Sequence, residues 1–275
     1  MRRRLPLRRW LLLGFLGLFI LFLYGPTLTI LILSFQGPDG GLTFPMNGVS
    51  TVWFRRLFET QAVGDFGGSL LRSLALAAMV TVTTVVISVS AGLAFRRRFP
   101  GADVMFTLTV ASLIIPSILV SLGVGLLFSQ AGLDPTWYGS AFGAQLTWTL
   151  PFGLLIMFAV FNRFNAAWEE AANDLGASPW QRFRHVVLPI IAPSVVGIAL
   201  FGFTLSYDEF ARTLLTAGSD NTLPLEIFGM TTNVTTPVLY ALGTATTVFS
   251  FLLIGGVAVI LRLIVSPRRA RLDER

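Results

Sequence analysis

The residue types that usually carry out catalysis or bind metals are scarce in this sequence. Its 275 residues include no cysteine, no lysine and a single histidine, His185. Thiolate metal sites, cysteine nucleophiles and histidine-pair metal sites are therefore excluded. The lysine of a phosphate-binding loop and the lysine of a Schiff base are missing as well. We expect that the chain is not an enzyme, that it holds no metal, and that it binds no ATP of its own.

The most informative acidic residues lie in one hydrophilic segment, residues 163–187. A run of good helix formers from residue 165 or 166 to residue 175 predicts a short helix. Gly176 follows at a position where helices commonly end with a positive φ. Ser178 and Gln181 have the spacing of a capping box, which predicts a second short helix. The segment is thus expected to form a helix–turn–helix elbow, with acidic residues on its first helix: Glu169, Glu170 and Asp174.

The spacing within this segment is long and specific. Glu170-Ala171-Ala172 is followed after three residues by Gly176, after nine more by Val186, and then by Leu188-Pro189. This pattern resembles the EAA loop of the permease subunits of binding-protein-dependent ABC importers. In that family the loop is a coupling helix that fits a groove on a separate ATP-binding subunit. The resemblance implies a set of coupling residues: Glu169, Glu170, Ala171, Ala172, Asp174, Gly176, Leu188 and Pro189. The alternative is an interfacial loop in which Glu170 is merely solvated.

The same resemblance implies a set of partners. An importer of this kind contains a dimer of ATP-binding subunits, a second homologous permease and an extracytoplasmic substrate-binding protein. ATP and magnesium would then be bound by the ATPase, with no cofactor in this chain. The isoelectric point near 10.9 could also indicate nucleic-acid binding, but the arginines do not form a basic face. No nucleic-acid partner is expected.

A second acidic cluster lies at the expected outer end of an apolar stretch. Asp208 and Glu209 are adjacent, and Arg212 follows within one helical turn. Adjacent carboxylates near a low-dielectric region need a compensating cation. That cation could be Arg212, if the helix continues; an arginine of the binding protein or of the partner permease; or a cationic substrate. These three residues are our candidates for an outer-face or pathway site.

Two further stretches indicate a subgroup of the family. The stretch Leu42–Pro45, with Gly48 and Trp53-Phe54, looks like an outer loop of the spermidine/putrescine-type permeases. Residues 203–225 are similar to the corresponding segment of their second permease. The resemblance implies transport of a polyamine such as spermidine or putrescine. Related members carry opines, aminobutyrate or aminoethylphosphonate, and these remain alternatives.

The composition shows which elements must carry these sites. Hydrophobic residues make up 54% of the chain and charged residues only 12%, with a mean hydropathy of +0.74. A soluble domain has about 25% charged residues. We therefore predict an all-α, polytopic membrane protein, forming a single domain over residues 1–275 and interrupted by the cytoplasmic coupling elbow between helices four and five. Its six transmembrane helices are expected at 10–35, 70–95, 104–129, 138–161, 188–207 and 238–265.

The distribution of arginines predicts the orientation. Sixteen of the 20 arginines fall in the two terminal segments, the loop after the second span and the elbow. By the positive-inside rule both termini are cytoplasmic. The resemblance implies that the membrane is a bacterial inner membrane. The first apolar stretch is too long for a cleaved signal peptide, so we expect it to be retained. An ATPase-independent channel or secondary carrier is the alternative class. The elbow and the lack of a mid-span carboxylate argue against it.

Overall fold

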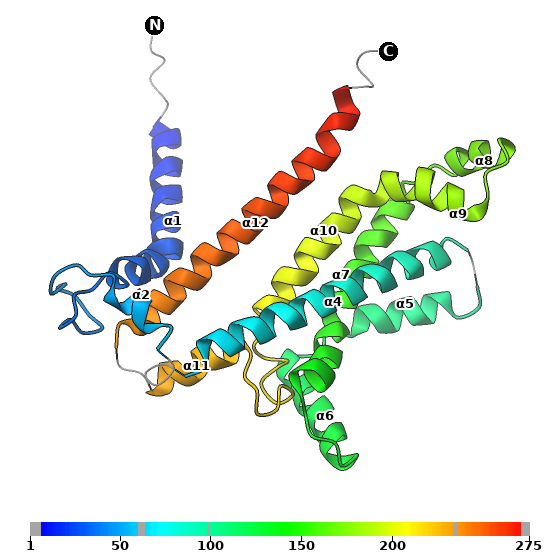
Figure 1. Cartoon of the computed structure of the whole chain (residues 1–275). Helices are drawn as coiled ribbons and strands as arrows, with labels where there is room; N and C mark the ends of the chain where they lie inside the picture. The colour runs from blue at the N-terminus through cyan, green and yellow to red at the C-terminus, as the bar shows by residue number, and fades with distance from the viewer. Residues whose placement is uncertain (1–6, 60–63, 98, 234–235, 271–275) are drawn as a thin grey trace, which may run out of the picture. The chain divides into compact units, whose positions relative to one another are not determined.

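The computed structural model describes residues 7–59, 64–97, 99–233 and 236–270. Regular structure in these ranges is helical, apart from one isolated antiparallel bridge between Gln36 and Val49. The all-α prediction is confirmed. Figure 1 traces the helices from α1 at the blue end to α12 at the red end.

The chain divides into two compact units. The first comprises residues 1–66 and 227–252, and the second comprises residues 67–226 and 253–275. The prediction of one domain over the whole chain therefore stays a prediction.

The first unit contains α1 (Leu7–Leu33), the short α2 (Val52–Arg56) and part of α12 (Val238–Ala270). The loop between α1 and α2 is held by two side chains that donate to backbone carbonyls. The Trp53 indole donates to Gln36 over 2.7 Å, and the Tyr240 hydroxyl donates to Leu42 over 2.7 Å. Most side chains of α1 are exposed and apolar. Such a surface is stable only in contact with lipid or with another apolar surface.

The second unit contains both candidate sites. Its helices, in chain order, are α4 (Phe66–Phe95), α5 (Ala102–Ala111), α6 (Ser117–Gln130), the π-helical turn η1 (Trp137–Ala141), α7 (Phe142–Phe161), α8 (Ala167–Asp174), α9 (Pro179–Arg182), the π-helical turn η2 (Phe183–Val187) and α10 (Leu188–Tyr207). Helix α11 (Leu223–Asn233) leads from this unit back to the first.

Helices α4, α7 and α10 pack closely around an apolar core. Met157 and Phe161 of α7 are buried with Ile191 and Ile198 of α10. Helix α4 approaches α7 at glycine: a Cβ on Gly153 would lie 2.2 Å from the Ser88 hydroxyl oxygen. Gly92 lies equally tightly against α7, where a Cβ would be 2.8 Å from the Met157 Cβ. Helices α4 and α7 therefore form one closely packed pair.

Among the residues that the structure describes, four helical segments are long and apolar enough to cross a membrane: Arg8–Leu33, Phe66–Phe95, Trp137–Phe161 and Pro179–Tyr207. The helical backbone of α12 covers the sixth predicted range. The third range is different. The range predicted for the third span, 104–129, holds two helices, because the chain leaves the helix after Ala111 and re-enters it at Ser117. Pro116 explains the break, since proline lacks an N–H and disfavours helical geometry in the residue before it. How many times the chain crosses the membrane stays a prediction.

Candidate functional site

The segment between α7 and α10 folds locally as its residue types predict. Helix α8 ends at Asp174, and Gly176 adopts a φ of +78°. The capping box is present: the Ser178 hydroxyl accepts from the Gln181 backbone N–H over 3.3 Å, and the Gln181 side chain accepts from the Ser178 N–H over 2.8 Å. Figure 1 shows the two short helices together at one end of α7 and α10. We call residues 163–187 the elbow.

Helix α10 begins at Leu188, the first residue of the fifth predicted range, but it is not separated from the elbow. Helix α9, the turn η2 and α10 form one run of 29 helical residues from Pro179 to Tyr207. Pro189 stands near the start of α10, directly after the π-helical turn η2. The wider π-helical turn accommodates Pro189, which has no backbone N–H to donate. The second elbow helix is therefore continuous with α10.

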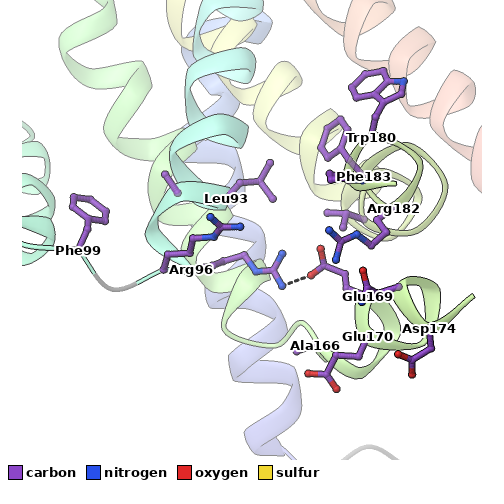
Figure 2. Close-up of a pocket in the computed structure, with 15 residues that line it drawn as sticks. Leu93, Arg96, Phe99, Ala166, Glu169, Glu170, Asp174, Trp180, Arg182 and Phe183 are labelled. Carbon is purple, nitrogen blue, oxygen red and sulfur yellow. Dashed lines mark hydrogen bonds and ion pairs between the residues drawn. The ribbon is translucent and has the colours of Figure 1, made fainter. Parts of the chain in front are cut away.

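An open groove of about 1030 Å³ runs along the elbow (Figure 2). The predicted residues Glu169, Glu170 and Asp174 line it, whereas Ala171, Ala172, Gly176, Leu188 and Pro189 do not. Three arginines line the same groove, Arg96, Arg97 and Arg182. The groove therefore combines acidic and basic groups in equal number among its lining residues.

The two adjacent glutamates of α8 have different environments. Glu169 forms an ion pair with Arg96, and both side chains are about three-quarters buried, at 23% and 25% exposure. In Figure 2 the Glu170 carboxylate points away from Arg96. Glu170 is exposed, and its side chain has no hydrogen bond or ion pair within the ranges that the structure describes. Glu170 is thus free to bind a partner, while Glu169 is occupied within the chain.

Sequence reasoning missed Arg96. This residue lies directly after α4, and its guanidinium carbon also stands 4.8 Å from the ring centre of Phe164 and 5.2 Å from that of Phe161. Arginine over aromatic faces is a favourable cation–π arrangement. In the sequence Arg96 is only one of three consecutive arginines, and its partner Glu169 is 73 residues away. No local pattern connects the two.

The tip of the elbow is apolar. Leu175 is 89% exposed and Trp180 is 64% exposed. The Trp180 ring packs 5.6 Å from Phe183, so its orientation is held from one side. Large apolar side chains this exposed, beside acidic residues, are typical of a protein–protein contact surface.

The second cluster is built on the segment after α10, residues 208–222. Helix α10 ends at Tyr207, so Arg212 does not lie on a continuing helix. It nevertheless contacts Glu209: its backbone N–H donates to the carboxylate over 2.8 Å, and its guanidinium lies 3.9 Å from the other carboxylate oxygen. Both side chains are nearly inaccessible, at 2% exposure for Arg212 and 7% for Glu209. Burial raises the pKa of Glu209, and the N–H and charge of Arg212 oppose that rise.

Arg212 also holds the segment against its neighbours. Its guanidinium donates to the hydroxyls of Ser117 and Thr147, and lies 4.6 Å from the ring centre of Trp148. Asp208 differs from Glu209, because it is exposed and its carboxylate has no hydrogen bond or ion pair among the described residues. Of the three partners considered for this cluster, the internal one is therefore present for Glu209 and absent for Asp208.

The helices and the elbow define the class of the molecule: a multi-pass helical membrane protein with an organised hydrophilic elbow. Residues 84–271 match the protein family described as the inner membrane component of binding-protein-dependent transport systems. The match covers more than half of the chain. The chain therefore belongs to this family, and it is a permease, a transport subunit of the inner membrane.

Relatives of known function are similar over most of their length. The spermidine/putrescine transport system permease protein PotC of Haemophilus influenzae is 30% identical over 235 residues, which are 85% of this chain and 89% of that protein. The putrescine transport system permease protein PotI of Escherichia coli K12 is 28% identical over 263 residues, or 91% of this chain and 86% of that protein.

Solved structures agree with the fold. A chain of a bacterial ABC transporter involved in the import of the acidic polysaccharide alginate superimposes with a TM-score of 0.70. The comparison covers 94% of this chain and 97% of that one. At 17% identity this likeness concerns the fold alone.

Proposed function

We propose that the chain forms half of the translocation pathway of an ATP-driven importer for a polyamine such as spermidine or putrescine. In this assembly it pairs with a second homologous permease, a dimer of ATP-binding subunits and an extracytoplasmic substrate-binding protein. The names of the relatives support the substrate class. ATP and magnesium are bound by the ATPase subunits, where hydrolysis takes place.

The elbow is the proposed docking element for the ATP-binding subunit, and one observation carries this assignment. A free carboxylate, Glu170, lies on the elbow whose tip presents Leu175 and Trp180, two exposed apolar side chains held by a capped turn. A charged group beside an exposed aromatic anchor is the composition expected at the centre of a protein interface. Gly176 has the positive φ that the turn between the two short helices requires.

Co-purification tests the docking role. Glu170→Lys reverses the free charge without touching the Arg96–Glu169 pair, so the permease should insert normally but retain at least tenfold less ATP-binding subunit. Asp103→Lys is the matched control, because Asp103 is an exposed acid on α5 outside the groove. Equal retention by Glu170→Lys and wild type would contradict the docking role.

Asp208 is the proposed contact for the cationic substrate. Its carboxylate is exposed and free of partners among the described residues, while the neighbouring Glu209 is paired with Arg212. A carboxylate favours an ammonium group by direct charge attraction. Asp208→Asn should reduce spermidine uptake at least fivefold with an unchanged yield of assembled transporter. Unchanged uptake would remove Asp208 from the pathway, and preference of the wild type for an anionic solute would overturn the polyamine proposal.

The proposed orientation places the N-terminus, the C-terminus and the elbow in the cytoplasm. A reporter fused after Arg275 should behave as cytoplasmic, and a reporter inserted at Asp220 should behave as external. The opposite result for the pair would invert the topology.

A further inference from the structure

The ion pair between Arg96 and Glu169 joins two parts of the chain that the elbow alone does not connect. The second elbow helix continues directly into α10, since residues 179–207 form one helical run. The first elbow helix, α8, is joined to α7 only through the short non-helical stretch 162–166. Helix α8 also packs against α9 and η2, and those contacts lead to α10. A link from α8 to α4 and α7 therefore needs a further contact.

We propose that Arg96 is a positioning residue that fastens α8 to the cytoplasmic ends of α4 and α7, so that movement of the docked ATPase reaches this helix pair as well as α10. The inference rests on the proposed coupling function of the elbow. Arg96 would act on transport through Glu169 and the two aromatic rings, without touching ATP or the transported solute.

The contacts of Arg96 reach three elements at once. Its guanidinium pairs with Glu169 of α8 and lies over the rings of Phe161, the last residue of α7, and Phe164, in the connection. Phe164 in turn packs against Trp168 of α8, with ring centres 5.5 Å apart. One cation therefore connects the end of α4, the end of α7 and the start of the elbow.

Helices α4 and α7, which Arg96 contacts, are packed closely enough to move as one body. Gly92 and Gly153 bring α4 and α7 so close that a Cβ at either position would overlap the other helix. Buried Thr84 and Thr149 share a hydrogen bond of 2.9 Å across the same interface. Close packing of this kind transmits displacement with little loss. A displacement of Arg96 would thus displace α4 and α7 together.

The partial burial of the Arg96–Glu169 pair suits the transmission of movement from α8 to α4 and α7. At about one-quarter exposure the charges are less screened than a surface pair, yet they keep enough contact with water to avoid the full cost of burying two ions. The proposal also accounts for the different environments of Glu169 and Glu170. Glu169 faces inward to Arg96, which leaves Glu170 for the partner subunit.

Spin-label distances test the fastening directly. The chain has no cysteine, so Ala167→Cys on α8 and Val86→Cys on α4 give one labelled pair at two exposed positions, and Ala167 lies outside the proposed docking tip. Measured on the full transporter complex, the distance distribution should be narrow in the wild type and at least twofold wider with Arg96→Gln or Glu169→Gln. Arg163→Gln is the matched control, because Arg163 is an exposed arginine after α7 that does not line the groove.

A functional measurement on the same variants tests the consequence. In proteoliposomes with the ATPase and loaded binding protein, Arg96→Gln should keep its ATPase subunits but consume at least fivefold more ATP per spermidine imported. The exchanged pair Arg96→Glu with Glu169→Arg should recover part of both readouts, since it restores the ion pair but not the ring contacts.

The two proposals fail in different ways. A wild type that neither retains an ATPase nor imports spermidine with ATP would contradict the proposed function. The proposed role of Arg96 is contradicted if the distance distribution of Arg96→Gln is as narrow as that of the wild type. It is also contradicted if the distribution widens but the ATP consumed per spermidine stays normal. A third contradicting result is an exchanged pair that restores neither the narrow distribution nor the normal ATP consumption.

Discussion

The elbow and the segment after α10 each contain two adjacent acids. In each pair one acid is bound to an arginine, while its neighbour has no hydrogen bond or ion pair among the residues that the structure describes. In the elbow Glu169 pairs with Arg96 at about one-quarter exposure, across 73 residues of chain. After α10, Glu209 pairs with Arg212 three residues away, and both are almost completely buried. The same residue types therefore serve different ends. A partly exposed pair between distant segments can transmit movement, whereas a fully buried local pair holds a segment in place.

The largest expected effect concerns the buried pair. Arg212→Ala leaves Glu209 without its cation, removes the donors to Ser117 and Thr147, and empties the space against Trp148. Breaking a buried ion pair from one side typically costs about 3–5 kcal/mol. We expect a strong loss of correctly folded protein, measured as the monodisperse yield and the thermal midpoint in detergent.

Arg163→Ala provides the control for this loss, because it removes an exposed arginine from the same unit. Its yield and midpoint should match the wild type. If Arg212→Ala behaved like this control, the segment after α10 would not depend on the buried pair.

The turn of the elbow should give the next largest effect. Gly176 has a φ of +78°, and a non-glycine residue there costs about 1–2 kcal/mol. Gly176→Ala should therefore distort the elbow and lower ATPase retention several-fold. Gly197→Ala on α10 is the matched substitution, since no atom lies within 4 Å of its added Cβ and its φ is not positive. Similar ATPase retention by the two variants would show that the turn geometry is not needed.

The sequence anticipated local features better than distant ones. The turn at Gly176 and the capping box of Ser178 and Gln181 depend on residues a few positions apart, so type and spacing were sufficient. The pairing of Arg96 with Glu169 depends on how α4 and α7 pack, and nothing near either residue indicates it. The broken third span is intermediate, because Pro116 is visible in the sequence but the length of the interruption, residues 112–116, is not.

The two acids after α10 should separate stability from transport. Glu209→Gln weakens a buried charge pair and should lower the thermal midpoint measurably, by an amount equivalent to about 1–3 kcal/mol. Asp208→Asn changes an exposed group without a partner among the described residues, and should leave stability within about 0.5 kcal/mol. Equal midpoints for the two variants would contradict the different environments assigned to the acids.

The smallest effect on stability is expected at the elbow tip. Trp180→Ala removes a side chain that is 64% exposed, so the thermal midpoint of the isolated permease should change little. Its retention of the ATP-binding subunit should nevertheless fall at least tenfold, as expected for an aromatic anchor at an interface. Full retention would exclude the tip from the docking surface.

The most direct test of the central claim is ATP-dependent spermidine uptake by the reconstituted complex, compared between the wild type, Glu170→Lys and Asp103→Lys. We predict uptake by the wild type and by Asp103→Lys only when ATP and the loaded binding protein are both present, and less than one-tenth of that uptake by Glu170→Lys. Wild-type uptake by Glu170→Lys, or uptake by the wild type without ATP, would contradict the assignment of the elbow as the coupling element of an ATP-driven importer.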